Sequence, residues 1–244
     1  MKKRLCVLLS VLVIFAASAM GCSQTDPKES YQNALQKISE LKAVDMDMSM
    51  EMTMSAAGES LTFTMDSHMQ ITEEELLMES SLDLFGQGSM DTNVYYKDGY
   101  LYVDTMGEKI KVASTLEDAM SMANTTTGPL EEDIIQNIQA TKENGVTTLS
   151  FSVDGTKMTD YVESQMAVMQ DMTDMGEIAI GEVTGVMKIN EEGYPTEVTM
   201  KLPYTMTIEG ETITVDMSIE MAYNNPGQPV TMNFPDFSAF VEAA

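Results

Sequence analysis

The chain has 244 residues, of which 39 are Asp or Glu and 13 are Lys or Arg, and its formal net charge at pH 7 is −26. Arg4 is the only arginine, so the rest of the chain lacks the guanidinium fork that grips phosphate, and its acidity repels nucleic acid. These features exclude a nucleic-acid-binding protein.

The N-terminus has the pattern of an export signal. Basic residues at positions 2–4 precede an apolar run over 5–17 and then Ser18-Ala19-Met20-Gly21-Cys22. A charged start, a short apolar stretch and small residues before a cut are typical of a cleaved signal and too short for a stable membrane span. Cleavage before Cys22 is the favoured reading, which makes residues 1–21 the signal peptide. An ordinary signal peptide cut after Ala19 or Gly21 is the alternative.

Removing residues 1–21 leaves ten lysines against 39 acidic groups, a formal charge of −29. Such acidity favours solubility and spacing from an anionic envelope. Cys22 is then the only cysteine, so the fold has no intrachain disulfide and must rely on its core. We expect residues 22–30 to be the new N-terminal cysteine with a flexible tether and residues 31–244 to form one β-rich domain, because no internal Pro/Gly/Ser-rich linker interrupts them.

The first elements after the tether are a helix and three strands. Apolar positions from Tyr31 to Leu41 follow three- and four-residue spacing, which predicts a helix with one apolar stripe. Strict alternation then predicts strands over Val44–Ser55, Leu61–Ile71 and Leu76–Leu84. In the first strand every second residue from 46 to 54 is methionine. One face of this sheet is therefore polar and the other is apolar, and the only histidine, His68, falls on the polar face.

Later turn signals predict hairpins and further helices. Gly-containing turns around residues 86–88, 98–99, 144–145, 192–193 and 209–210 separate strand-like runs and predict an antiparallel meander that ends in a long strand over 212–223. Helices are predicted near Ser114–Met122, Leu130–Ile138 and Thr156–Met172. The predicted fold class is α+β, a strongly curved antiparallel sheet in the form of a half-barrel, with helices covering its apolar concave face.

Methionine is unbranched and polarizable, and it fills changeable apolar space better than branched residues do. The apolar face therefore predicts either a ligand cavity or a closed core, since alternating apolar residues more often fill a core. The candidate cavity-lining residues are Met46, Met48, Met50, Met52, Met54, Phe63, Met65, Met69, Met158, Val162, Met166, Met217 and Met221.

Other chemistries have weaker support. Met-x-Met runs supply soft Cu(I) ligands, but neighbouring methionines on one strand face lie roughly 7 Å apart and no cysteine assists. The series Asp45-x-Asp47-x-Ser49-x-Glu51 lacks the glycine and the final glutamate of an EF-hand loop. Catalytic signatures for serine hydrolases, zinc proteases and phosphate-binding loops are also missing. We expect no enzyme activity, no cofactor and no dedicated metal site.

Several segments together resemble a known family. Gly21-Cys22 is similar to a bacterial lipobox, at which a diacylglyceryl cysteine becomes the first residue. The segments 93–102 (NVYYKDGYLY) and 107–111 (GEKIK), and the final strand ending at Tyr223 followed by Pro235 and Phe237, resemble the LolA/LolB and LppX/LprG lipoproteins and the lipoproteins of Gram-positive bacteria with that fold.

The resemblance implies a half-open antiparallel barrel plugged by helices, with acyl chains held between them, and binding rather than catalysis. Carriers of the LolA type can place an arginine inside the cavity. This chain has none after Arg4, which leaves the ligand class open.

The sequence thus predicts an exported lipoprotein, anchored to the outer face of the cell membrane by Cys22, that binds a lipid or similar hydrophobic ligand and no nucleic acid. A non-carrier surface module with a solid core, which presents its acidic face to an envelope or cell-wall partner, is the alternative from a different class.

Overall fold

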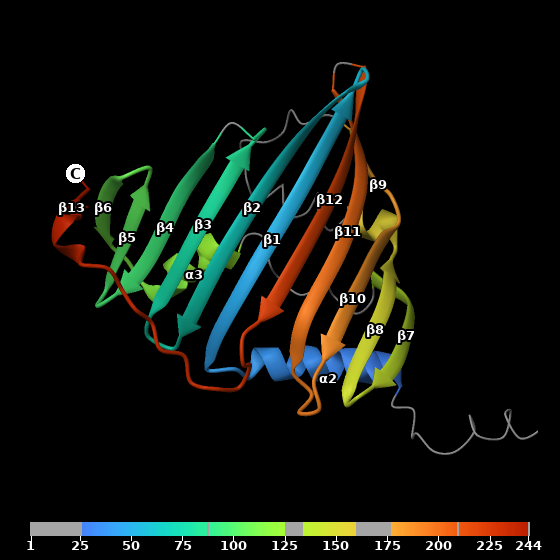
Figure 1. The fold of residues 1–244 in the computed structure, drawn as a ribbon, viewed down its shortest axis with the longest axis horizontal. Helices are drawn as coiled ribbons and strands as arrows, with labels where there is room; N and C mark the ends of the chain where they lie inside the picture. Colours follow the sequence, from blue (N-terminus) through green and yellow to red (C-terminus); the bar gives the residue numbers. More distant parts are fainter. Residues whose placement is uncertain (1–25, 87, 125–133, 160–176, 209, 244) are drawn as a thin grey trace, which may run out of the picture.

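The fold is one large antiparallel sheet (Figure 1). The computed structural model describes residues 26–243 apart from 87, 125–133, 160–176 and 209. Thirteen strands lie in the order β13-β6-β5-β4-β3-β2-β1-β12-β11-β10-β8-β7, with β9 paired to β11 beside this path. The short β13 pairs with β6 in parallel, and the other pairs are antiparallel. The export signal and Cys22 lie outside the described residues.

The elements have the following bounds: α2 Pro27–Ser39, β1 Ala43–Ala56, β2 Glu59–Thr72, β3 Leu76–Leu84, β4 Ser89–Lys97, β5 Tyr100–Thr105, β6 Glu108–Ala113, α3 Leu116–Asn124, β7 Ile135–Glu143, β8 Val146–Val153, β9 Glu177–Ile180, β10 Val183–Ile189, β11 Pro195–Ile208, β12 Glu211–Tyr223, the 3₁₀ turn η2 Phe237–Ala239 and β13 Val241–Glu242.

The centre of the sheet follows directly from the alternating sequence. Met46 of β1 lies opposite Met69 of β2 on one side and Tyr223 of β12 on the other. Cross-strand partners project to the same face, so the methionines of β1 lie on one face with the apolar residues of both neighbours. The predicted strands over 44–55, 61–71 and 76–84 are confirmed.

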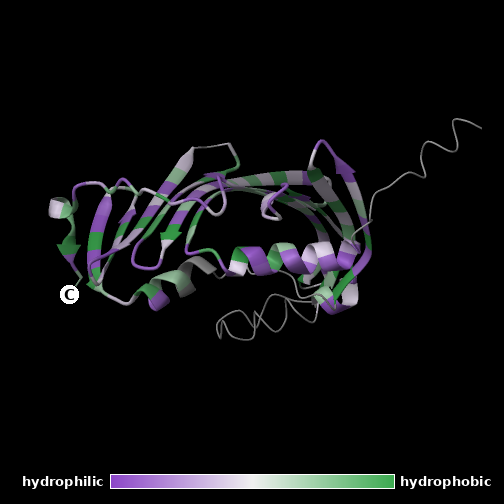
Figure 2. Cartoon of the chain, turned by 90° about the horizontal axis from the view of Figure 1, so that it is seen from below, coloured by the Kyte–Doolittle hydropathy of each residue, from purple (hydrophilic) through white to green (hydrophobic). Residues whose placement is uncertain are grey.

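The sheet is strongly curved and open. Figure 2 shows it as an arch with α2 and α3 on its concave side. Its two edges are β13 and β7, which do not pair with each other. The predicted curved antiparallel sheet is therefore confirmed, although the curvature stops short of a closed barrel. Helical cover over the whole concave face remains a prediction.

Two predicted helices differ from the structure. The helix predicted over 130–138 is wrong where the structure describes it, because Ile135–Glu143 form strand β7. Gln136 and Gln139 face Ser152 and Ser150, so a bulge inserts one extra residue in β7. This insertion produces the three-residue apolar spacing of a helix. Of the helix predicted over 156–172, residues 155–159 are helical and residues 160–172 lie outside the described part.

Helix α2 begins at Pro27, before the Tyr31 boundary expected from the sequence. Asp26 is its N-cap and accepts a hydrogen bond from the backbone N–H of Lys28 at 3.0 Å. A capping carboxylate followed by proline at the first helical position is a strong helix start. None of the described helices is long and apolar enough to cross a membrane.

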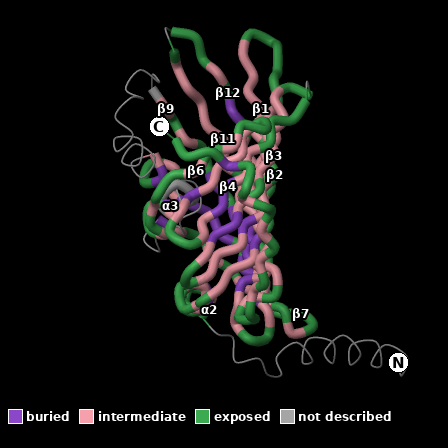
Figure 3. Tube along the Cα trace, turned by 90° about the vertical axis from the view of Figure 1, so that its left-hand side faces the viewer, coloured by how far each residue is buried: buried purple, intermediate pink, exposed green. Residues whose placement is uncertain are grey.

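Three clusters of buried side chains hold the sheet. The largest lies where α2 packs on the β7, β8, β10 and β11 end, and includes Tyr31, Leu149 and Val183. The second joins β3, β4 and β5 to α3 through Leu76 and Ala119. The third forms on the opposite face from α3, where the C-terminal segment packs Phe240 on Leu77 and Tyr95. Buried residues follow the strands, and the hairpin ends are exposed (Figure 3).

Candidate functional site

The concave face is an ordered apolar surface at its centre. Strand register sets its residues in rows that cross the sheet. The row through Met50 runs as Leu82, Met65, Met50, Ile219, Met200, Gly185 and Phe151. From β3 to β11 the side chains of this row are half-buried, and at β8 Phe151 is buried.

An apolar pocket of about 760 Å³ opens on this face at the end of the sheet where β1 begins. The C-terminal end of α2 and the turn after it form one side, α3 forms another, and β1, β2 and the end of β12 form the floor. Its lining residues are Ile38, Ser39, Leu41, Lys42, Ala43, Val44, Met46, Met69, Ile71, Thr72, Glu73, Leu116, Met120 and Tyr223. The pocket thus joins helix ends to the apolar floor of the sheet.

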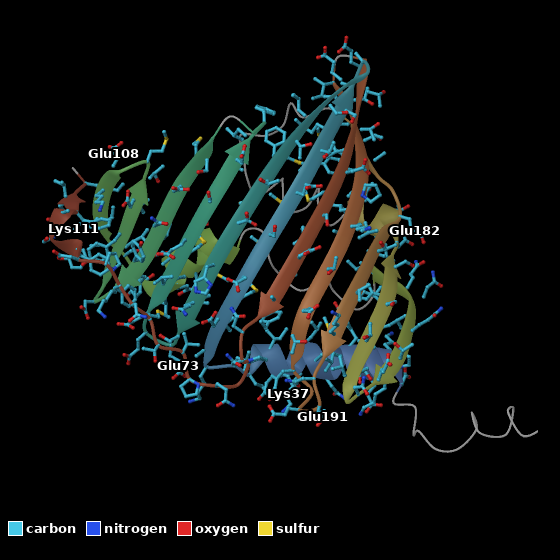
Figure 4. The ribbon with its side chains drawn as sticks, viewed as in Figure 1. Lys37, Glu73, Glu108, Lys111, Glu182 and Glu191 are labelled. Carbon is cyan, nitrogen blue, oxygen red and sulfur yellow. The ribbon has the colours of Figure 1, made fainter. Side chains whose placement is uncertain are left out.

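Few polar groups reach this pocket. Lys42 and Glu73 form an exposed ion pair of 3.7 Å at its rim, and Glu73 lies at the end of β2 in Figure 4. Deeper in, the Tyr223 side chain is half-buried, and burial raises the pKa of its phenol above the usual value. An apolar pocket with a few polar groups at its mouth is the usual form of a site for an amphipathic small molecule.

The structure places the predicted lining residues in three settings. Met46 and Met69 line the pocket. Met158 is buried among Phe151 and its neighbours in the closed cluster under α2, and Val162 and Met166 lie outside the described residues. The remaining members lie half-buried on the concave face, and they are Met48, Met50, Met52, Met54, Phe63, Met65, Met217 and Met221. Their role as ligand contacts remains a prediction.

Of the residues that line the pocket, only Met46 and Met69 were predicted from the sequence as lining residues. Ile38 and Leu41 belong to the apolar stripe expected of the first helix, and Leu116 and Met120 lie on the helix expected near 114–122. The stripes identified these residues as apolar, but periodicity does not show which helix end meets which strand. Register alone places Tyr223 beside Met46.

The outer face of the same strands is polar. His68 lies there as predicted, and its Nδ1 is 2.7 Å from Oδ1 of Asp47. Asn224 donates to Asp47 and to Asp45 at 2.8 Å each. The bond from Asn224, together with His68, lowers the pKa of Asp47. Asp47 and His68 also line an acidic groove of about 700 Å³. Within the described part of the chain, no cluster of three or more His, Cys, Asp or Glu is arranged to hold a metal ion.

Known proteins resemble this chain mainly in fold. LppX from Mycobacterium tuberculosis has a TM-score of 0.41 and 10% identity, with 85% of this chain and 98% of LppX covered. LprF from Mycobacterium bovis has a TM-score of 0.41 and 12% identity, with 86% and 96% covered. A LolA-superfamily protein from Nitrosomonas europaea has a TM-score of 0.25 and 10% identity, with 79% and 92% covered.

These proteins are of the types that the sequence resembles, but scores and identities this low transfer no ligand and no activity. No curated protein matches the sequence significantly. Residues 26–236 match a protein family that is described as a family of unknown function, DUF6612. This match spans most of the chain, which is therefore a member of the DUF6612 family.

Proposed function

We propose that this protein is an exported lipoprotein that binds a lipid or similar hydrophobic ligand on the concave face of its sheet. The observation that carries the proposal is the apolar pocket of about 760 Å³ between α2, α3 and the β1–β2 floor. Its volume falls within the roughly 300–1,000 Å³ range of ligand pockets. The chemistry is binding, with no catalytic role for its residues.

The methionine surface beside the pocket supports the same function. The side chains of Met48, Met50, Met52 and Met54 are only half-buried, although a row of thioethers gains nothing from contact with water. Exposed contiguous apolar surface in a soluble domain commonly marks an interaction site. Methionine also adapts to ligands of different shape. We infer that an apolar chain longer than the pocket continues over these residues.

Anchoring through Cys22 would place the pocket near a bilayer. Cys22 precedes the N-cap Asp26 by four residues, which span at most about 14 Å when extended. A diacylglyceryl group on Cys22 would therefore hold α2 close to the membrane surface. The C-terminal end of the same helix lines the pocket. A lipid could pass from the bilayer into the pocket without a long path through water.

Native mass spectrometry of residues 23–244, followed by organic extraction of what co-purifies, tests the proposal. We expect a stoichiometric lipid, or uptake of an added fluorescent fatty acid or phospholipid. A protein that is empty after purification and takes up none of these probes would contradict ligand binding. That result would favour the surface module with a solid core, which uses its acidic face to meet a partner.

A pocket-filling variant identifies the site. Met120 lines the pocket and is half-buried, so Met120→Trp should occupy part of it and lower ligand uptake by about tenfold. Val186→Trp is the matched control, because Val186 is exposed on the outer face of β10. Equal loss of uptake in both variants, or none in Met120→Trp, would place the ligand elsewhere.

A further inference from the structure

The otherwise apolar centre of the concave face carries one polar row. Register sets Ser67 of β2 beside Ser80 of β3, Ser80 beside Thr92 of β4, and Thr92 beside Thr105 of β5. All four side chains therefore project to the methionine face. Adjacent strands lie about 4.8 Å apart, so the four hydroxyls form a line roughly 14 Å long. We call Ser67, Ser80, Thr92 and Thr105 the hydroxyl row.

Apolar residues border the hydroxyl row at β2 and β3. Met69 and Met78 lie two positions from Ser67 and Ser80 in one direction along the strands. Met65 and Leu82 lie two positions away in the other direction. Beyond Ser67, the positions in line with the hydroxyl row on β1, β12 and β11 are Met48, Met221 and Val198, which are all apolar. The polar positions are therefore a local interruption of the apolar face. Met69 also lines the pocket, so the row begins about 7 Å from the pocket floor.

The hydroxyls of the row are half-buried and lack partners within the described part of the chain. The structure shows no hydrogen bond from the side chains of Ser67, Ser80, Thr92 or Thr105 to a described residue. Hydroxyls on the outer face behave differently, since Ser81 donates to Asp91 at 2.8 Å and Thr53 lies 3.0 Å from Thr62. Serine and threonine on an apolar face are costly to cover unless what covers them supplies a hydrogen bond.

Charge decides which kind of polar group fits. Every lysine of β1–β6 and β9–β12 alternates onto the outer face, as Lys97, Lys111 and Lys188 illustrate. No cation of these strands is thus available to a phosphate or carboxylate lying on the row. A hydroxyl donates to the oxygen of an ester, an ether or another hydroxyl, and it accepts from the O–H of another hydroxyl, so the row suits ester, ether or hydroxyl groups.

We propose that the ligand is an uncharged lipid with an oxygen-rich polar part, such as a diacylglycerol or a glycosyl diglyceride. Its polar atoms bind the hydroxyl row while its chains occupy the methionine face and the pocket. This inference rests on the proposed function and specifies the ligand class for the same surface.

The test compares three probes on residues 23–244, which contain every described residue. The probes are dioleoylglycerol, oleate and the pure hydrocarbon diphenylhexatriene. The triple variant Ser67→Ala, Ser80→Ala, Thr92→Val removes three hydroxyls and adds no bulk. We expect it to bind dioleoylglycerol about tenfold or more weakly and diphenylhexatriene with unchanged affinity. The control variant Ser49→Ala, Ser218→Ala, Thr199→Val removes outer-face hydroxyls of β1, β12 and β11 and should leave both affinities unchanged.

Each outcome bears on the inference separately from the proposed function. Equal affinity of wild type and triple variant for dioleoylglycerol would overturn the role of the row, and so would tighter wild-type binding of oleate. Parallel loss of both dioleoylglycerol and diphenylhexatriene would also overturn it, because the variant would then have damaged the whole surface. Failure of the wild type to bind any of the three would refute the proposed function itself.

Discussion

Two regions of one concave face differ in what covers them. At the β7–β8–β10 end, α2 packs Tyr31 and Ala34 over the sheet, and Leu149 and Val183 are 0% exposed. At the centre, β1 offers a line of methionines that remain half-buried beyond Met46. Both regions belong to the same continuous sheet, so the difference arises from the overlying helix and the residue types.

The residue types follow this division. The closed end contains shape-defined side chains, such as Phe151, Val153 and Ile189, which hold one arrangement against a fixed neighbour. The centre contains straight, flexible thioethers, which tolerate several arrangements. We infer that the closed end supplies most of the stability and that the centre is adapted for contact with something outside the chain.

The largest expected effect on stability comes from truncating one side chain to alanine in each region. Leu149→Ala should lower the free energy of unfolding by about 2–5 kcal/mol, because it leaves a cavity in a fully enclosed cluster. Met50→Ala removes a half-buried side chain and should cost roughly 1 kcal/mol. Urea unfolding followed by circular dichroism measures both. Similar losses for the two variants would show that the centre is as tightly packed as the closed end.

A glycine at the closed end gives the second test. Gly185 lies beneath the Phe151 ring, and a Cβ added there would lie 2.3 Å from two ring carbons. Gly185→Ala should therefore displace the ring and destabilise the fold by about 1–3 kcal/mol. The double variant Gly185→Ala, Phe151→Leu provides the control, since a smaller side chain at 151 should absorb part of the cost. Additive losses would show that the cost of Gly185→Ala does not come from its contact with the Phe151 ring.

The division was only partly visible in the sequence. Strict alternation fixed β1, β2 and β3 to within two residues, because one wet and one apolar face leave a strand a single register. Alternation did not show that α2 covers Leu149 and leaves Met50 open. That outcome depends on where α2 lies across β7, β8 and β10, which follow it in the chain by roughly 100 residues or more.

The sequence did not predict the structure of segments that lack a regular spacing of apolar residues. The bulge in β7 gave a helical spacing, and the C-terminal segment gave no spacing at all. Phe237 stacks on Tyr102 with ring centroids 3.9 Å apart, and Phe234 meets Tyr95 at 6.3 Å. These aromatic contacts fix the segment to the outer face of β4 and β5. Contacts between residues so distant in sequence leave no local pattern to detect.

Alkaline pH should weaken the closed end. Burial, followed by the nearby Tyr223, raises the pKa of Tyr31 from 10.0 to about 12. The folded state thus keeps the Tyr31 proton more tightly than the unfolded state, and the stability from this difference is complete below pH 10 and is lost as pH rises toward 12. Absorbance at 295 nm and circular dichroism, measured together, should show unfolding within this range. Tyr31→Phe removes the titrating group and should shift the transition to higher pH, and an unchanged transition would assign it to another residue.

The smallest effect is expected beneath the open centre, on the outer side of β1. The hydrogen bond from Asn224 lowers the pKa of Asp47 below 3.8, so its stabilising effect is present above pH 3.8 and is lost as pH falls through the lowered value. The Asp47 side chain is 56% exposed, and solvent screening limits the contribution to under about 1 kcal/mol. Asn224→Ala should therefore reduce stability slightly at pH 7 and not at pH 2. A loss equal to that of Leu149→Ala would mean that the polar network, rather than the core under α2, holds the sheet, and the division between the two regions would fail.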